Sequence, residues 1–107
     1  MTEAEIMRDI QVAISQAGHR VFRNNCGSLK DMRGQWVRFG IANPGGSDLI
    51  GWTSSGRFLA IEVKTATGRA TDEQRQFIAA VRAAGGYAGI ARTPEQAKDI
   101  SNGIICD

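Results

Sequence analysis

The 107-residue sequence has no long apolar run, and this absence limits where the protein can reside. A membrane-spanning helix needs about 20 consecutive apolar residues. No apolar run in this sequence is that long, which excludes a membrane-spanning helix. Acidic residues at Glu3, Glu5 and Asp9 interrupt the N-terminal segment, which therefore lacks the apolar stretch of a signal peptide. We expect a cytoplasmic protein, with a bacterial or phage-infected cell as the host.

Cysteine and histidine are also scarce. The two cysteines, Cys26 and Cys106, have no metal-type spacing, and without an export signal we expect both to be reduced. His19 is the only histidine and is expected to have a structural or surface role.

A formal charge of +2 is compatible with nucleic acid as a partner but does not require it. The length allows one domain, residues 1–107, around one hydrophobic core.

Three segments begin with the same helix-start signature. In each, a threonine is followed three residues later by Glu or Gln, the spacing of a capping box that satisfies free backbone N–H groups. The three motifs are Thr2-x-x-Glu5, Thr71-x-x-Gln74 and Thr93-x-x-Gln96. The predicted helices span residues 3–17, 72–84 and 94–101.

The segments between and after these helices have the composition of short strands. The predicted strands span residues 19–23, 36–41, 48–53, 57–65 and 87–92, with a short edge strand possible at 103–106. Ser54-Ser55-Gly56 indicates a hairpin between two of them. The helix before residues 87–92 allows that strand to lie parallel to its neighbour. Residues 27–35 are polar with glycine near both ends, and we predict a mobile loop there. The fold class is α/β, a mixed sheet flanked by helices.

The strand at residues 57–65 carries an unusual polar pair. Alternate side chains of a strand share a face, so Glu62 and Lys64 project together, away from the apolar residues between and before them. Asp48 follows a Gly-Gly turn, and the predicted hairpin brings it towards Glu62. Two carboxylates can hold Mg²⁺, which activates water and neutralises a phosphate. Lys64 is expected to stabilise charge electrostatically rather than to abstract a proton.

The order Asp48…Glu62-Val63-Lys64 resembles the PD-(D/E)XK nuclease pattern, with Ser47 where the pattern has proline. More narrowly, the chain is similar to a stand-alone VRR-NUC (virus-type replication-repair nuclease) domain from Glu3 to about Asp99. The matching motifs are Glu3-x-x-Ile6, Arg23-Asn24-Asn25-Cys26-Gly27, Gly46-Ser47-Asp48-Leu49-Ile50-Gly51, Glu62-Val63-Lys64-Thr65, Thr71-x-x-Gln74-x-x-Phe77 and Gly85-Gly86-Tyr87.

This resemblance implies an αβββαβ core and DNA cleavage that depends on Mg²⁺ or Mn²⁺. It also implies small homodimers that act on branched DNA such as Holliday junctions, which would place the protein in DNA repair. The metal ligands would be Asp48, Glu62 and the backbone carbonyl near Val63. Lys64 would complete the catalytic group.

Two further catalytic positions are open between alternatives. For the acid on the first helix, Glu5 already has a capping role, whereas Glu3 lies on the apolar stripe of that helix and is favoured. Gln74 fits the second capping box, yet it also shares the inner face of its helix. It either caps the helix or contacts the phosphate or the attacking water, the role that the resemblance implies.

Basic and amide side chains outside this group are candidates for binding the DNA backbone. Arg23 and Asn25 end the first strand with donors suited to phosphates. Lys30 and Arg33 lie in the predicted loop, and Arg69 precedes the second helix.

The resulting prediction is a metal-dependent DNA endonuclease. The alternatives are a non-cleaving nucleic-acid-binding module, a nuclease that acts on flaps or other DNA structures, and a small hydrolase that acts on nucleotides.

Overall fold

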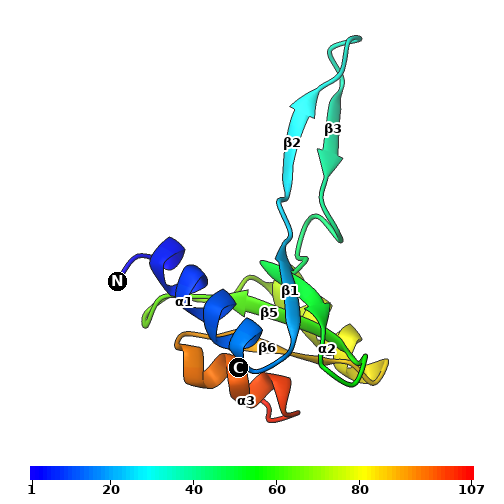
Figure 1. Cartoon of the computed structure of the whole chain (residues 1–107). Helices are drawn as coiled ribbons and strands as arrows, with labels where there is room; N and C mark the ends of the chain where they lie inside the picture. Colours follow the sequence, from blue (N-terminus) through cyan, green and yellow to red (C-terminus); the bar gives the residue numbers. More distant parts are fainter.

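A mixed four-stranded sheet forms the body of the protein, and a two-stranded arm projects from it (Figure 1). The computed structural model describes residues 1–107. In chain order the elements are α1 (Glu3–Gln16), β1 (Arg20–Arg23), β2 (Gly27–Lys30), β3 (Trp36–Phe39), β4 (Leu49–Trp52), β5 (Phe58–Val63), α2 (Asp72–Ala83), β6 (Tyr87–Ala91) and α3 (Pro94–Ser101). None of the three helices has the length and hydrophobicity that a membrane crossing requires.

The strands of the main sheet lie in the order β1-β4-β5-β6. β4 lies between β1 and β5 and is antiparallel to both, and the turn at Ser54-Ser55-Gly56 joins β4 to β5 as predicted. β6 is parallel to β5, as predicted, because α2 carries the chain back across the sheet between them. In chain order, and apart from the arm, the body is therefore built from a helix, three antiparallel strands, a second helix, a parallel strand and a third helix.

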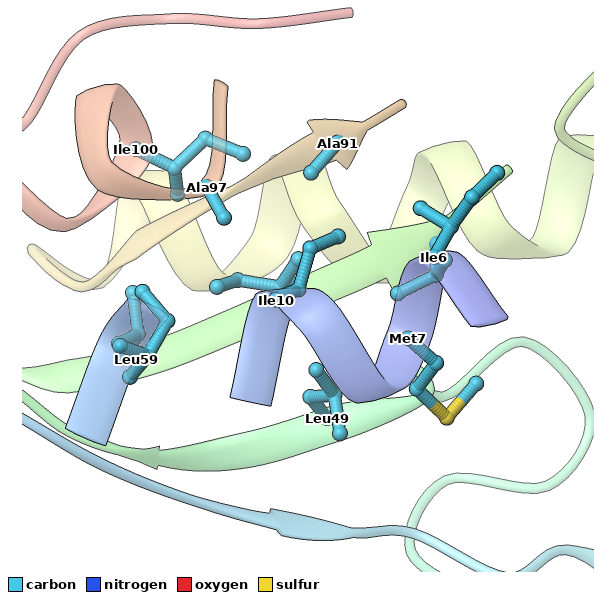
Figure 2. Close-up of a cluster of buried hydrophobic side chains, with 11 residues drawn as sticks. Ile6, Met7, Ile10, Leu49, Leu59, Ala91, Ala97 and Ile100 are labelled. Carbon is cyan, nitrogen blue, oxygen red and sulfur yellow. The ribbon is translucent and has the colours of Figure 1, made fainter. Parts of the chain in front are cut away.

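The larger part of the core lies between the sheet and the helices α1 and α3. Figure 2 shows this cluster, in which Ile6, Met7 and Ile10 of α1 face Leu49 and Leu59 of the sheet and Ile100 of α3. A smaller cluster joins the opposite face of the sheet to α2 through Ala60, Ala88, Ile90, Ile78 and Val81. The sheet is thus covered by helices on both faces, but α2 reaches only part of its face.

The strand β5 divides its side chains between these two layers. Leu59, Ile61 and Val63 are fully buried in the larger cluster, as the predicted alternation requires. Glu62 therefore points to the opposite face, where it contacts α2 through Gln74. The alternation of this strand places a carboxylate inside the protein.

Each threonine that was predicted to cap a helix does so. The hydroxyl groups of Thr2, Thr71 and Thr93 accept hydrogen bonds from the backbone N–H three residues later. At Thr71 the reciprocal bond is also present, because its own N–H donates to Gln74 Oε1. These caps begin the three helices at the predicted residues.

The prediction of a mobile loop at residues 27–35 is wrong. Residues 27–30 form β2, which pairs with β3 in a separate two-stranded sheet (Figure 1). The side chain of Asp31 accepts hydrogen bonds from the N–H groups of Arg33 and Gln35, and Gly34 has a φ of 77°. This turn, which glycine enters without steric cost, joins the two strands. We call residues 27–39 the arm.

Residues 103–106 do not form the suggested edge strand. Only one ladder-like contact is present at this edge, from the N–H of Ile90 to the carbonyl of Cys106. The N–H of Ile104 instead bonds back to the carbonyl of Asp99, which closes the end of α3.

Candidate active site

The predicted hairpin brings Asp48 and Glu62 together at one end of the sheet. Leu49 and Ile61 are paired across β4 and β5, so their neighbours Asp48 and Glu62 lie at the same end of the two strands. The N–H of Val63 donates to Asp48 Oδ2 over 2.8 Å. This bond fixes the orientation of the Asp48 carboxylate next to β5.

Glu62 is a charged side chain that the fold buries. It is only 2% exposed, although a carboxylate is costly to bury. Its Oε1 accepts a hydrogen bond from Gln74 Nε2 over 3.1 Å and lies 3.8 Å from Lys64 Nζ. Its Oε2 is buried and has no hydrogen-bond partner. Half of this carboxyl group therefore lacks a protein partner.

The surroundings of Glu62 raise its pKa from the ordinary value of 4.5 to about 9. The largest cause is burial, followed by the hydrogen bond that only the protonated carboxyl group can donate to Asp48 and by the negative charge of Asp48. Lys64 acts in the opposite direction, and Glu3 adds a smaller increase. The protein's own cations do not fully neutralise the two carboxylates, and a proton or an added cation would.

Gln74 makes the predicted capping contact and also bonds to Glu62 in the candidate site. Its Oε1 accepts from the N–H of Thr71 over 2.9 Å, which completes the capping box. Its Nε2 donates to Glu62 over 3.1 Å. The cap therefore holds the amide in the orientation that reaches the site.

The two candidate acids of α1 lie in different surroundings. Glu5 bonds to Thr2 at the start of the helix, through both its N–H and its carboxylate. Glu3 is exposed, and its charge is close enough to Glu62 to affect the pKa of that residue. Glu5 therefore takes part in the cap of α1, and Glu3 is the acid of this helix whose charge acts on Glu62.

A cleft of about 670 Å³ opens at the site. Asp48 and Gln74 line it, together with Arg23 and Asn25 from the end of β1 and Phe39 from the foot of the arm. Of the five residues predicted to bind nucleic acid, Arg23 and Asn25 are therefore beside the candidate site. Lys30 lies on the arm, Arg33 in the turn at its tip, and Arg69 in the exposed segment before α2.

The Gly-Gly turn before Asp48 packs too closely for any side chain. A Cβ atom on Gly46 would lie 1.9 Å from the carbonyl oxygen of Ile41. A Cβ on Gly45, which has a φ of 103°, would lie 2.6 Å from the carbonyl oxygen of Glu73 in α2. The turn that presents Asp48 is thus held against both α2 and the foot of the arm.

Asn24 has a structural role that the sequence did not indicate. Its side chain bonds to the N–H and carbonyl of Ile41 and to the carbonyl of Ser47. Asn43 adds bonds to the carbonyls of Gly27 and Phe39. The two amides tie the end of β1 and the foot of the arm to the segment before Asp48. Asparagine in an irregular segment was the only signal in the sequence.

The mixed α/β fold thus brings two carboxylates, a lysine and a glutamine together beside a cleft, a set of groups suited to the cleavage of phosphodiesters. Residues 9–94 match the family model of the VRR-NUC domain, and the chain belongs to this family. Comparison with curated proteins and with solved structures gives no significant match. The VRR-NUC domain implies a nuclease with a DNA substrate and a divalent metal ion. Glu3 lies outside the matched residues.

The chemistry of the site fits such an ion. The protein has no group of three or more His, Cys, Asp or Glu side chains that could hold a metal ion. An ion at this site would therefore have at most two carboxylate ligands, Asp48 and Glu62. Mg²⁺ commonly binds through one or two carboxylates and keeps several waters. The unpartnered Oε2 of Glu62 is a hard oxygen ligand of the type that Mg²⁺ prefers.

The raised pKa of Glu62 predicts how the stability of the metal-free protein depends on pH. A carboxyl group whose pKa is higher in the folded state stabilises the fold while it is protonated, and this contribution is lost as pH rises from about 4.5 to about 9. In EDTA, the melting temperature should fall across this range. In Glu62→Gln the decrease should be smaller by at least about 4 °C, which corresponds to roughly 1 kcal/mol.

Asp9→Asn is the matched control, because Asp9 is an exposed carboxylate on α1 with no capping role. Its melting temperature should follow that of the wild type at every pH. A Glu62→Gln variant with the pH dependence of the wild type would show that Glu62 is ionised normally in the fold.

Proposed function

We propose that this protein is a metal-dependent endonuclease that hydrolyses DNA phosphodiester bonds, with residues 1–107 acting as one domain. The observation that carries the proposal is the buried Glu62 carboxylate, which lies beside Asp48 and has one oxygen without a partner. The body of one helix, three antiparallel strands, a helix and a parallel strand supports a PD-(D/E)XK core. The arm is then an insertion between the first two strands of that core.

Asp48, Glu62 and the carbonyl of Val63 would hold the ion, Mg²⁺ or Mn²⁺. When bound, such an ion supplies a nucleophile at neutral pH and neutralises charge on the phosphate. The bond from the N–H of Val63 orients Asp48 for this purpose. The buried position of Glu62 excludes bulk water from its carboxylate, which strengthens its attraction to a cation.

The other residues would orient the attacking water and stabilise the charge that develops on the phosphate. Lys64 places an ammonium 3.8 Å from Glu62, where its charge favours the anionic transition state. The capping box holds the amide of Gln74 in place, and this amide donates a hydrogen bond to Glu62 at the same position. Glu3 would face the metal or its water from α1. Arg23 and Asn25 in the cleft would bind the flanking phosphates, with Lys30, Arg33 and Arg69 further along the DNA.

The substrate class that fits best is branched DNA such as a Holliday junction, bound by a homodimer. One chain of this size offers little surface for gripping a junction, whereas a twofold dimer presents two sites that match the symmetry of four arms. Such an activity would serve in DNA repair. Flaps are the alternative DNA structure, and cleavage rates on junction, flap and duplex substrates distinguish the two.

Exposed apolar surface supports the dimer. On the sheet face that α2 leaves uncovered, Phe22 is 57% and Trp52 is 48% exposed, and both line a groove of about 600 Å³. The arm carries Leu29 and Val37, which are also exposed and which no other part of the chain covers. Large exposed apolar patches mark interaction sites. In a dimer, Leu29 and Val37 on the arm of each chain would cover the groove of the other chain.

The non-cleaving binding module is the second candidate, and the predicted effect of Asp48→Asn on cleavage distinguishes the two. This change keeps the size of the side chain and removes its charge, so cleavage of a labelled four-way junction in Mg²⁺ should fall at least about 100-fold. Binding of the junction should persist. The measurement is the initial cleavage rate on junction, flap and duplex substrates.

Asp9→Asn is the matched control, because Asp9 is an exposed acid on α1, and it should cleave as the wild type does. If the wild type and both variants bind DNA and none cleaves any substrate of the panel, the enzyme proposal fails and the binding module remains.

The dimer is tested by mass measurement in solution. The wild type should have twice the mass of the chain at micromolar concentration. Phe22→Ser should shift this protein towards the monomer, because it removes an apolar side chain from the uncovered sheet face. Val12→Ser, an equally exposed apolar residue on α1, should leave the mass unchanged. A monomeric wild type at all concentrations would contradict the dimer.

A further inference from the structure

The two faces of the arm differ in chemistry. Residues that are directly paired across two strands share a face. Lys30 pairs with Trp36 and Ser28 with Arg38, which places one aromatic and two basic side chains with a hydroxyl on one face. We call these four residues the basic face. The opposite face carries Leu29 opposite Val37, and Phe39 opposite Gly27.

All four residues of the basic face are exposed, and Trp36 is the most notable of them. It is 69% exposed, an unusual state for a large apolar side chain. The ammonium group of Lys30 lies 5.4 Å from the centre of its ring, a cation–π contact that limits the orientations of the indole. The ring is therefore oriented and mostly accessible to solvent.

The arm begins and ends at the candidate site. Cys26, which precedes β2, and Phe39, which ends β3, both line the cleft that contains Asp48. From there the arm extends away from the sheet (Figure 1). The bonds of Asn24 and Asn43 hold its foot in place. A DNA strand that leaves the cleft in this direction would run along the arm.

We propose that the basic face binds a DNA strand whose bases are unpaired, such as the single strand of a flap. Lys30, Arg38 and the hydroxyl of Ser28 bind phosphates, and Trp36 stacks on one base. The base must be unpaired, because in a duplex both faces of each base are already covered by stacking, whereas single strands offer them to aromatic side chains. This inference rests on the proposed nuclease function only in taking DNA as the ligand. Binding at the basic face itself requires neither metal nor cleavage.

The test is DNA binding in the Asp48→Asn background, which separates binding from cleavage. Fluorescence anisotropy compares a labelled 20-nucleotide single strand with a blunt duplex of the same sequence. Trp36→Ala should weaken single-strand binding roughly 5- to 150-fold, which corresponds to about 1–3 kcal/mol for one stacked base. Trp36→Phe should restore part of the loss, because it keeps an aromatic ring. Duplex binding should change much less.

Lys30→Ala combined with Arg38→Ala tests the phosphate contacts. For single strands each phosphate contact adds about 0.7 to the slope of log affinity against log salt, so the double variant should lower the slope by about 1.4. Met32→Ala is the matched control, because Met32 lies in the turn at the tip of the arm and is fully exposed. Melting temperatures should be equal in all variants, because the arm is separate from the core.

Single-strand binding by Trp36→Ala at the strength of the parent would overturn the proposal, and so would equal losses on single strand and duplex. These outcomes are independent of the nuclease test. If the wild type cleaves junctions while Trp36→Ala binds as its parent does, the arm proposal alone fails. If no DNA is cleaved but Trp36→Ala loses single-strand binding, the arm proposal stands and the nuclease proposal fails.

Discussion

The burial of the Glu62 carboxylate next to Asp48 is the constraint on which the candidate site depends. A carboxylate in this position destabilises the fold unless it is protonated or paired with a cation. The surrounding contacts only partly satisfy it: Gln74 and Lys64 serve one oxygen, and the other has no partner. A site with this deficit of positive charge is suited to bind a divalent ion, and the family to which the chain belongs implies one.

Several unrelated parts of the chain serve to hold this pair. The alternation of β5 turns Glu62 away from the main core, and the capping box at Thr71 fixes Gln74 against it. The Gly-Gly turn allows Asp48 to approach Glu62. Gly46 packs directly against Ile41, where there is no room for a Cβ atom. These elements are held together by hydrogen bonds to backbone groups. The site is therefore assembled by the fold, before any ligand binds.

The parts that follow from local patterns could be predicted from the sequence. The caps at Thr2, Thr71 and Thr93 signal the helix starts through side chains only three residues apart. The meeting of Asp48 with Glu62 follows from the hairpin between their strands. The arm was missed because Lys30, Asp31 and Arg33 make residues 27–35 look like a polar loop, although Asp31 and Gly34 form a tight turn. The bonds of Asn24 could not be predicted, since they join residues 17 and 23 positions apart.

We propose that a divalent ion completes the Asp48–Glu62 pair, and calorimetry of metal binding is the decisive test. Because the pKa of Glu62 is about 9 without metal, an ion that binds at pH 7 must displace its proton. Titration of Mg²⁺ or Mn²⁺ in buffers of different ionisation enthalpy should show about one proton released for each ion bound, and none in Glu62→Gln. Binding without proton release, or equal binding by Glu62→Gln, would show that the ion does not bind at Glu62.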